Sequence, residues 1–299
     1  MSKSVTTSIA TNTIITGSKL IGFVATGSPT LFAETLHSLA DVGNQVLLLV
    51  GEKRSARTAT AKHPFGYGKE KFFWALVSAV SIFFVGFGVT LYHGIHSLLQ
   101  PTHVEPFTPM TIGLLLFSGA LESYTFVIAL KELGGFRGLK ENRSNTTVLA
   151  VLFEDSVALI GIALTLVVGF SSYFFGSNPV LDGVVSILVA LLLGVMAIIL
   201  ARLNREMLIG VADLSVNNEV LDLIEERSEI EVAVTSTVVG QDKVILFLKI
   251  DPETLPAGVS FEHLFKAADL MKRHVARKLK KEVVDVFWQF PEDLVATAA

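Results

Sequence analysis

The chain of 299 residues is 51% hydrophobic and only 17% charged, and its formal net charge is −4. So apolar a composition excludes an ordinary soluble protein of this length and indicates a membrane protein. The slightly negative charge argues against a nucleic-acid partner, and the absence of cysteine excludes disulfides and thiolate metal sites. The polar start of the chain lacks a basic stretch followed by a small-residue cleavage site, so we expect no removable signal peptide.

Long apolar stretches dominate the first two thirds of the chain. A membrane-spanning helix needs about 20 mostly apolar residues. Six stretches meet this requirement and predict six spans, at roughly 8–27, 29–50, 72–99, 108–130, 145–173 and 179–203. The first two stretches are separated only by the tight break at Gly27, Ser28 and Pro29, so we expect them to form a helical hairpin.

The basic residues of the loops fall on one side of the predicted membrane. Lys and Arg are concentrated between the second and third spans, between the fourth and fifth spans, and after the sixth. The opposite loops, around Ser28, at 101–106 and at 171–178, contain neither residue. By the positive-inside rule we predict an integral protein of the cell (inner) membrane with both termini cytoplasmic.

From about Ala212 onward the sequence has the pattern of a small soluble domain. The pattern predicts a helix, two strands, a second helix and a third strand, at 217–227, 232–239, 244–251, 261–280 and 283–290. The order αββαβ is typical of a two-layer, ferredoxin-like α+β domain. Such a small domain leaves part of its sheet exposed, and dimerisation would cover it.

His37 and Asp41 stand one helical turn apart inside the second apolar stretch, so their side chains share one face of the expected helix. An imidazole and a carboxylate on one face can bind the same divalent cation. Ionisable groups within a span point to a binding site or a pathway, although a buried polar network between the first two spans is the structural alternative. Glu34 is a weaker candidate ligand near the same face, and Asn44 and Gln45 are candidates to line the path from the cytoplasm.

Two adjacent acids, Glu154 and Asp155, occupy the middle of the fifth apolar stretch. Neighbouring residues of a helix point about 100° apart, so one acid can face the site while the other faces a neighbouring helix. We predict that Asp155 is a metal ligand and that Glu154 is either a fourth ligand or a proton-carrying neighbour. The structural alternative is an ion pair between these acids and Lys19 of the first span.

The histidines elsewhere give weaker signals. His63 lies in the basic loop 63–70, whose spacing does not match a phosphate-binding loop, and it is a candidate for a structural role or a weak metal contact. His263 and His274 lie about three turns apart on a predicted helix of the tail. We therefore expect no multi-ligand metal site in the soluble domain.

Taken together, these features resemble the cation diffusion facilitator family. The resemblance rests on the stretch 34–45 with its His-Ser-x-x-Asp core, on the His-Pro-x-Gly-Tyr-Gly loop at 63–68, on the acidic fifth span and on the αββαβ tail, and it covers nearly the whole chain. The acid pair at 154–155 resembles the branch that contains zinc transporter nine. The resemblance implies a homodimer that exports divalent cations, commonly zinc, in exchange for protons, with cytoplasmic domains that resemble copper chaperones.

The chain departs from the family pattern at three places. Many members carry a His or Asp four residues before the Asp of the fifth span, but this position is Val151 here, so the usual fourth ligand is missing and Glu154 or water is the candidate replacement. The loop keeps His63 but has Tyr67 where some members have a second His. The tail lacks the usual cluster of His and Asp, so we expect it to bind zinc poorly.

We therefore predict a membrane all-α domain of six transmembrane helices at 1–208 and a cytoplasmic α+β domain at 209–299. The predicted function is proton-coupled antiport of a divalent cation out of the cytoplasm, with His37, Asp41 and Asp155 as ligands and Glu154 as the leading fourth. Zn²⁺ is the expected cargo, although Co²⁺, Fe²⁺ and Mn²⁺ also suit an imidazole with carboxylates.

The expected partners are a second copy of the chain, the metal ions and protons that are its substrates, and the lipid bilayer. No cofactor, nucleic acid or enzymatic activity is expected. The rival prediction is a non-transporting membrane sensor or scaffold that acts through its soluble domain.

Overall fold

In the computed structural model, the chain folds into two compact units. The structure describes residues 2–26, 29–100, 108–175, 179–251, 254, 256 and 258–289, except for some side chains within these ranges, among them those of Glu34 and His37. One unit comprises residues 1–54 and 70–205, and the other comprises residues 55–69 and 206–299. The segment 55–69 therefore groups with the C-terminal residues, which the sequence pattern had not indicated.

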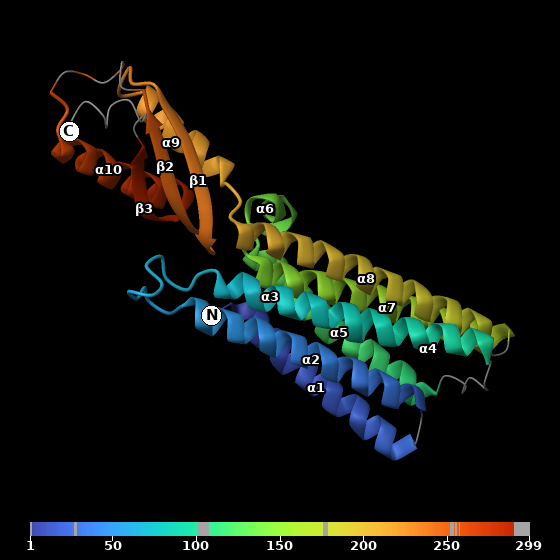
Figure 1. Cartoon of the computed structure of the whole chain (residues 1–299). Helices are drawn as coiled ribbons and strands as arrows, with labels where there is room; N and C mark the ends of the chain where they lie inside the picture. Colours follow the sequence, from blue (N-terminus) through green and yellow to red (C-terminus); the bar gives the residue numbers. More distant parts are fainter. Residues whose placement is uncertain are drawn as a thin grey trace. The chain divides into compact units, whose positions relative to one another are not determined.

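The first unit is built from long helices that run alongside one another (Figure 1). Their bounds are α1 Lys3–Thr26, α2 Pro29–Ser55, α3 Glu70–Ser81, the π-helical η1 Ile82–Phe87, α4 Gly88–Leu99, α5 Pro109–Glu132, the short α6 Gly135–Glu141, α7 Thr146–Phe175 and α8 Pro179–Ile209. Of these, α3, η1 and α4 follow one another without a break and form a single helical stretch.

Four helical stretches of the described chain are long and apolar enough to cross a membrane: Glu70–Leu99, Pro109–Glu132, Thr146–Val168 and Gly183–Ile209. They correspond to the third to sixth predicted spans. The polar helices α1 and α2 are not among them within the described residues. An apolar helical domain is therefore present, while the count of six spans stays a prediction.

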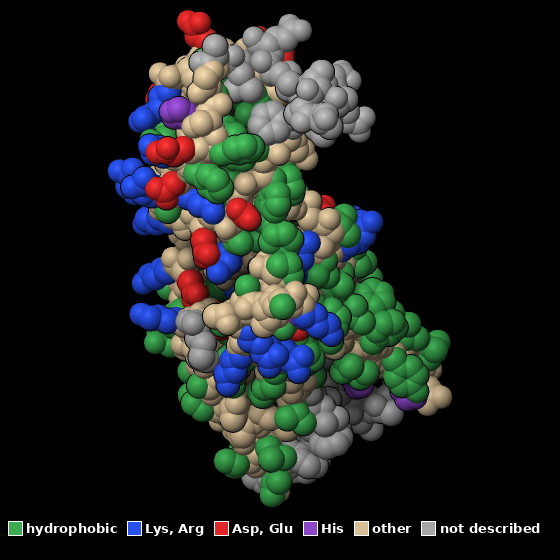
Figure 2. Space-filling view, turned by 60° about the vertical axis from the view of Figure 1, so that its left-hand side comes forward, with side chains coloured by type: hydrophobic (Ala, Val, Ile, Leu, Met, Phe, Trp, Pro, Cys, Tyr) green, Lys and Arg blue, Asp and Glu red, His purple; other side chains and the backbone are tan. Residues whose placement is uncertain are grey.

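The helix α7 forms much of the core of the helical unit. It packs against α1, α3 and α5, and it buries the continuous run from Val148 to Leu152. Hydrophobic side chains cover much of the face of the helical unit that Figure 2 shows. Tyr92 of α4 and Val195 of α8 are among the exposed hydrophobic side chains of this unit. An apolar exterior is expected of helices whose solvent is lipid, because polar and charged side chains are costly to place in hydrocarbon.

Small residues set the closest approach between helices. A Cβ added to Gly94 of α4 would lie 3.2 Å from the carbonyl oxygen of Gly183 in α8, and a Cβ added to Gly183 would meet the carbonyl of Gly94 at the same distance. Glycine at these two positions therefore allows the two backbones to come together, as small residues do in membrane helix pairs.

The second unit contains the predicted αββαβ elements. They are α9 Leu214–Glu225, β1 Val232–Gly240, β2 Lys243–Ile250, α10 Phe261–Leu279 and β3 Glu282–Gln289. The sheet has the order β1-β2-β3, with β1 and β2 antiparallel and β2 and β3 parallel. The helix α9 packs on β1, while α10 packs on β3 and on α9, so both helices contribute to one layer. The helix predicted at 217–227 begins earlier in the structure, at Leu214. Asp213 caps it there, because its side chain accepts a hydrogen bond from the backbone nitrogen of Val216.

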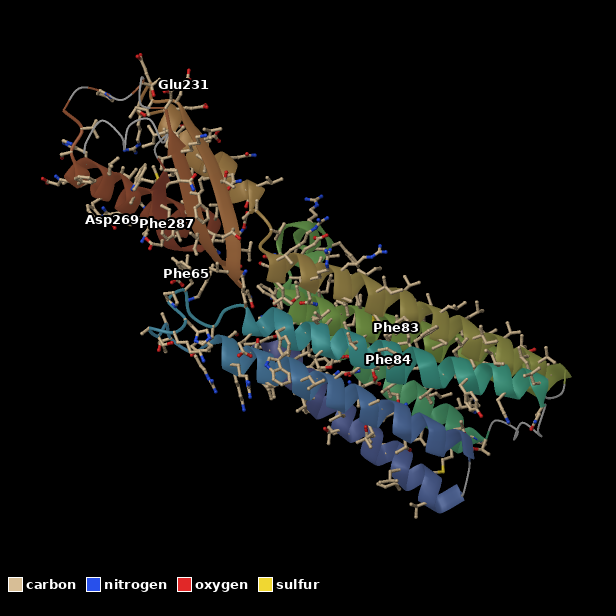
Figure 3. The ribbon with its side chains drawn as sticks, in the orientation of Figure 1. Phe65, Phe83, Phe84, Glu231, Asp269 and Phe287 are labelled. Atoms are coloured by element: carbon tan, nitrogen blue, oxygen red, sulfur yellow. The ribbon has the colours of Figure 1, made fainter. Side chains whose placement is uncertain are left out.

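An aromatic cluster attaches the segment 55–69 to this sheet. The rings of Phe247 in β2 and Phe287 in β3 are stacked with centroids 5.4 Å apart, and Phe65 meets Phe287 edge-on at 6.2 Å (Figure 3). The backbone also comes close beside Gly68, where an added Cβ would collide with the carbonyl of Val239 at the end of β1. The loop that the sequence marked only by its His-Pro-x-Gly-Tyr-Gly motif is therefore packed on the C-terminal sheet.

Candidate transport site

Asp155 lies in the N-terminal half of α7 and is 0% exposed. By strict distance and angle, neither of its carboxylate oxygens accepts a hydrogen bond from a described residue, although Thr125 and Glu122 of α5 both lie next to it. Thr125 of α5 lies beside it, but the Thr125 hydroxyl donates to the backbone carbonyl of Glu122 at 3.0 Å. A buried carboxylate without donors is costly, so this position calls for a proton or a cation.

Glu154, the neighbour of Asp155, is also buried but faces a different set of residues. Its Oε2 accepts a hydrogen bond from Nε2 of Gln45 in α2 at 3.4 Å, and the same nitrogen donates to Oγ of Ser8 in α1 at 2.6 Å. Its Oε1 has no hydrogen-bond partner within the described part of the chain. Glu154 therefore has one oxygen held by a polar contact to α2 and a second oxygen that is available.

Asp41 brings a third carboxylate to this region from α2. Its side chain is partly buried, and it interacts electrostatically with both Glu154 and Asp155. Three of the four predicted ligands thus come from two helices that are far apart in sequence and lie within electrostatic reach of one another.

The fourth predicted ligand, His37, has its backbone in α2, and its side chain lies outside the described residues, as does that of Glu34. Of the two residues predicted to line the cytoplasmic path, Asn44 is buried, and Gln45 is fully buried in the contact with Glu154.

Sequence reasoning missed a further acid, Glu122 of α5. It is only 7% exposed and lies beside Asp155, with which it interacts electrostatically. Its face of α5 also buries Ser118 and Thr125, and these three positions have the spacing of a single helix face. The available signal was the occurrence of an acid inside an otherwise apolar span, which is costly wherever it has no function.

The described side chains do not form a ready-made metal site. In the part of the chain that the structure describes, no group of three His, Asp or Glu residues stands close enough to hold a metal ion. The imidazole of His37 is not among these described side chains. A site with three ligands therefore requires the His37 side chain or a movement of the helices that carry the carboxylates.

The alternative that Lys19 neutralises the acids of α7 finds no support. The buried ammonium of Lys19 donates to Oγ of Ser38 in α2 at 2.9 Å. Glu154 is instead bonded to Gln45, and no ion pair links Lys19 to Glu154 or Asp155 among the described side chains. Lys19 thus helps to join α1 to α2, as a polar network between the first two helices would.

Val151 is not part of the carboxylate cluster, and His63 belongs to the other unit. Val151 is completely buried in the hydrophobic core of the helical unit, so the position that often carries a ligand in the family is a packing position here. His63 lies in the segment 55–69 of the other unit, where its ring packs against Tyr67 at 4.4 Å between centroids.

A buried polar network ties four helices together where α1, α3 and α7 begin and α2 ends. Nζ of Lys71 in α3 donates to Oδ1 of Asn145, just before α7, at 3.3 Å and lies 4.0 Å from Oε1 of Glu52 in α2. The same oxygen of Glu52 accepts from the backbone nitrogen of Ser2, just before α1, at 2.7 Å. Lys71 therefore has a structural role in addition to the positive charge that it adds to the loop.

Comparison with known proteins supports a role in metal transport. Residues 5–209 match the model of the cation efflux transmembrane domain. The chain is 35% identical over 204 residues to the mitochondrial proton-coupled zinc antiporter SLC30A9 of Xenopus laevis, a match that covers 64% of the chain and 35% of that protein. It is 33% identical over 216 residues to metal tolerance protein C4 of Arabidopsis thaliana, covering 70% of the chain and 47% of that protein.

A shorter match of 93 residues, at 32% identity, links the chain to the magnetosome protein MamM of Paramagnetospirillum magneticum and covers 31% of the chain and 29% of that protein. The chain thus spans between a third and a half of the length of the first two relatives. The predicted resemblance to the branch of zinc transporter nine is confirmed. Because the family model covers well over half of its length, the chain belongs to the cation diffusion facilitator, or cation efflux, family of membrane metal transporters.

Proposed function

We propose that the chain is a proton-coupled antiporter that moves a divalent cation, principally Zn²⁺, out of the cytoplasm. In this proposal it acts as a homodimer with six membrane spans and both termini cytoplasmic, in the cell (inner) membrane. His37, Asp41 and Asp155 bind the cation, with Glu154 as the leading fourth ligand.

The observation that carries the proposal is the environment of Asp155. This carboxylate is fully buried in an apolar helix, neither of its oxygens accepts a hydrogen bond of strict geometry from a described residue, and Asp41 and Glu154 lie within electrostatic reach. Several carboxylates in a medium of low dielectric repel one another, and a divalent cation relieves that repulsion.

Exchange for protons follows from the chemistry of these ligands. An imidazole must be neutral and a carboxylate ionised to bind a metal, so binding releases protons and release of the metal favours their return. Movement of the helices around the site would expose it alternately to the two sides of the membrane, as in other secondary transporters. No covalent step is required, and an enzymatic activity is not part of the proposal.

Zinc is the preferred cargo because an imidazole is present and because the relatives include proteins named as zinc antiporters. Cobalt, iron and manganese remain cargoes that an imidazole with carboxylates can bind. The sensor or scaffold alternative is less favoured, because such a protein has no need for buried acids in its apolar helices.

Reconstitution tests the proposal directly. Purified protein in liposomes with an acidic interior should take up Zn²⁺ and release protons in the same experiment. Asp155→Asn, which keeps the shape of the side chain but removes its charge, should abolish uptake while the protein remains monodisperse. Wild-type protein that takes up none of Zn²⁺, Co²⁺, Fe²⁺ and Mn²⁺ would refute the transport function and leave the sensor alternative.

A further inference from the structure

A buried polar stripe follows one face of α1. Ser4, Ser8 and Asn12 recur every fourth residue, so their side chains share one face of the helix, and they are 0%, 0% and 3% exposed. The helix packs against α5 and α7, so this face lies between helices and not toward lipid. At Ser8 the stripe meets Nε2 of Gln45, which also donates to Oε2 of Glu154. We call this row, which leads from the first turn of α1 to the carboxylates, the polar seam.

The polar seam begins in a buried ionic network, at the end of the helical unit where α1, α3 and α7 begin and α2 ends (Figure 1). Oγ of Ser4 is hydrogen-bonded to Oγ of Ser2 at 2.6 Å, and the backbone nitrogen of Ser2 donates to Oε1 of Glu52 at 2.7 Å. Nζ of Lys71 lies 4.0 Å from the same oxygen of Glu52 and donates to Oδ1 of Asn145 at 3.3 Å. The side chains of Lys71 and Glu52 are only 3% and 10% exposed. The network therefore joins four helices at the mouth of the seam.

The ionic network and the carboxylates lie at different depths of the helical unit. The separation between Asn145 and Glu154 along the chain corresponds to about 14 Å of helix. In the proposed orientation the network lies at the cytoplasmic end, because the basic loops lie there. A cation from the cytoplasm that follows the polar seam must therefore pass the network before it reaches Asp155. Since Ser4 and Ser8 are 0% exposed, the seam is closed to solvent in this structure.

An ion pair suits a contact that has to open and close. The attraction between two buried charges is largely offset by the loss of their hydration, so the pair adds little net stability while it is closed. When the helix ends part, water solvates both charges again, and the open arrangement is stabilised as well. Apolar contacts behave differently, because their exposure to water is unfavourable. Two arrangements of similar free energy are what alternating access requires.

We propose that Lys71 and Glu52 form a latch that closes the polar seam on the cytoplasmic side and opens to admit the cation. The inference rests on the proposed transport function and assigns its entry path to the seam between α1, α2 and α7. Lys71 is a positioning residue here, since it acts through the helix ends that it joins. Separation of the pair also leaves the carboxylate of Glu52 at the mouth of the seam, where its charge attracts a cation.

Cysteine accessibility tests the latch, because the chain has no cysteine of its own and a single introduced thiol reports access without background. Ser8→Cys places the thiol in the polar seam, and Ala197→Cys places it at a position of α8 that is 1% exposed in the apolar core. The full-length protein in lipid nanodiscs would react with a charged, membrane-impermeant methanethiosulfonate reagent, and the rate of labelling would be measured. Lys71→Met opens the latch, and Lys53→Met, at an exposed position of α2 beside Glu52, is the matched control.

Lys71→Met is expected to raise the labelling rate of Ser8→Cys by about 10-fold or more, since loss of one partner of a buried charge pair shifts an equilibrium by at least that factor. The rate at Ala197→Cys should not change, and Lys53→Met should behave as wild type at both positions. Uptake of Zn²⁺ by liposomes should fall in Lys71→Met, because a path that stays open on one side does not alternate. Binding of Zn²⁺ to the purified variant should be retained, because the carboxylates lie deeper in the helical unit.

An unchanged rate at Ser8→Cys, or an equal rise at Ala197→Cys, would overturn the inference, because the second result is a general loosening of the helices. If Lys71→Met does not fold, Glu52→Gln decides, since it keeps an acceptor for the backbone nitrogen of Ser2 and removes the charge that faces Lys71. Faster labelling of Ser8→Cys in that variant supports the latch, and a wild-type rate refutes it. Faster labelling in Lys71→Met together with no transport of the four metals by the wild type would refute the transport function alone.

Discussion

Nε2 of Gln45 donates a hydrogen bond to Oε2 of Glu154 at 3.4 Å, and this contact joins α2 to α7 at the level of the carboxylates. The same nitrogen reaches Ser8 of α1 at 2.6 Å, so one amide group holds three helices together. A movement that separates α2 from α7 would stretch or break this contact. Glu154 is thus placed either to bind the cation or to act as a tether between the helices.

Glu154→Gln separates these two roles. If Glu154 is a ligand, the variant should bind Zn²⁺ about 10-fold or more weakly, because a neutral amide is a poorer ligand than a carboxylate. If it carries a proton instead, affinity should be retained while uptake no longer depends on the pH gradient. Calorimetry and liposome uptake measure the two quantities. Gln45→Met is the matched control, since it removes the tether and leaves the carboxylate, and an effect equal to that of Glu154→Gln would exclude ligation.

His37→Asp should change the ranking of transported metals. Imidazole favours zinc and its late first-row neighbours, whereas carboxylates favour manganese and magnesium. We expect Zn²⁺ uptake to fall relative to Mn²⁺ uptake, and the pH profile to move toward acid, because a carboxylate loses its proton at lower pH than an imidazole. Competition assays across a pH series give both results. His93→Asp in α4 is the control, and an unchanged ranking and pH profile in His37→Asp would remove His37 from the site.

Phe65→Ala should loosen the segment 55–69 from the sheet of the C-terminal unit. Phe65 is 44% exposed, and its ring approaches that of Phe287 edge-on at 6.2 Å. Loss of one such ring pair weakens the local structure by about 0.5–1.5 kcal/mol. Hydrogen exchange on the full-length protein should therefore be faster in the segment 55–69. Phe261→Ala, at a position that is 80% exposed, should leave exchange in this segment unchanged; equal exchange in the two variants would contradict the proposed packing.

Lys281 and Asp213 form a pH-dependent clamp at the start of α9. Nζ of Lys281 donates to Oδ2 of Asp213 at 2.6 Å, and Oδ1 of Asp213 accepts from Ser215 at 2.6 Å and from the backbone nitrogen of Val216 at 3.3 Å. Partial burial raises the pKa of Asp213, but the hydrogen bonds from Lys281 and Ser215 outweigh it and hold the pKa below its ordinary value. Stability from this clamp is thus present above the unfolded pKa of about 3.9 and is lost as the pH falls through the lower folded pKa.

Lys281→Met should therefore destabilise the first turn of α9 at neutral pH by about 1 kcal/mol, an amount typical of a partly exposed charged hydrogen bond. Hydrogen exchange of the α9 amides, corrected for intrinsic rates, measures the difference from pH 7 downward. Wild type and variant should converge below the folded pKa of Asp213. Lys266→Met, which removes an exposed ion pair with Glu262, should have little effect. A difference between wild type and Lys281→Met that persisted unchanged into acid would disprove the clamp.

The sequence by itself predicted the elements whose signals are local. Apolar length located the helices, and alternation of side chains located the strands of the αββαβ unit, because these patterns depend on residues close together in the chain. The spacing of His37 and Asp41, one turn apart, likewise follows from the geometry of a single helix. The family was visible for the same reason, since its motifs lie within short stretches.

Only the tertiary structure could bring Glu122 beside Asp155 or Gln45 beside Glu154, because these pairs depend on which faces of α5, α2 and α7 pack together. It also decided that Lys19 bonds to Ser38 and that Phe65 packs on Phe287, which a pattern of charges and aromatic residues does not specify. Apolar periodicity says that a helix is buried, but many helix pairings bury the same area. The choice among them is made by the shapes of small residues such as Gly94 and Gly183 and by the need of buried polar groups for partners.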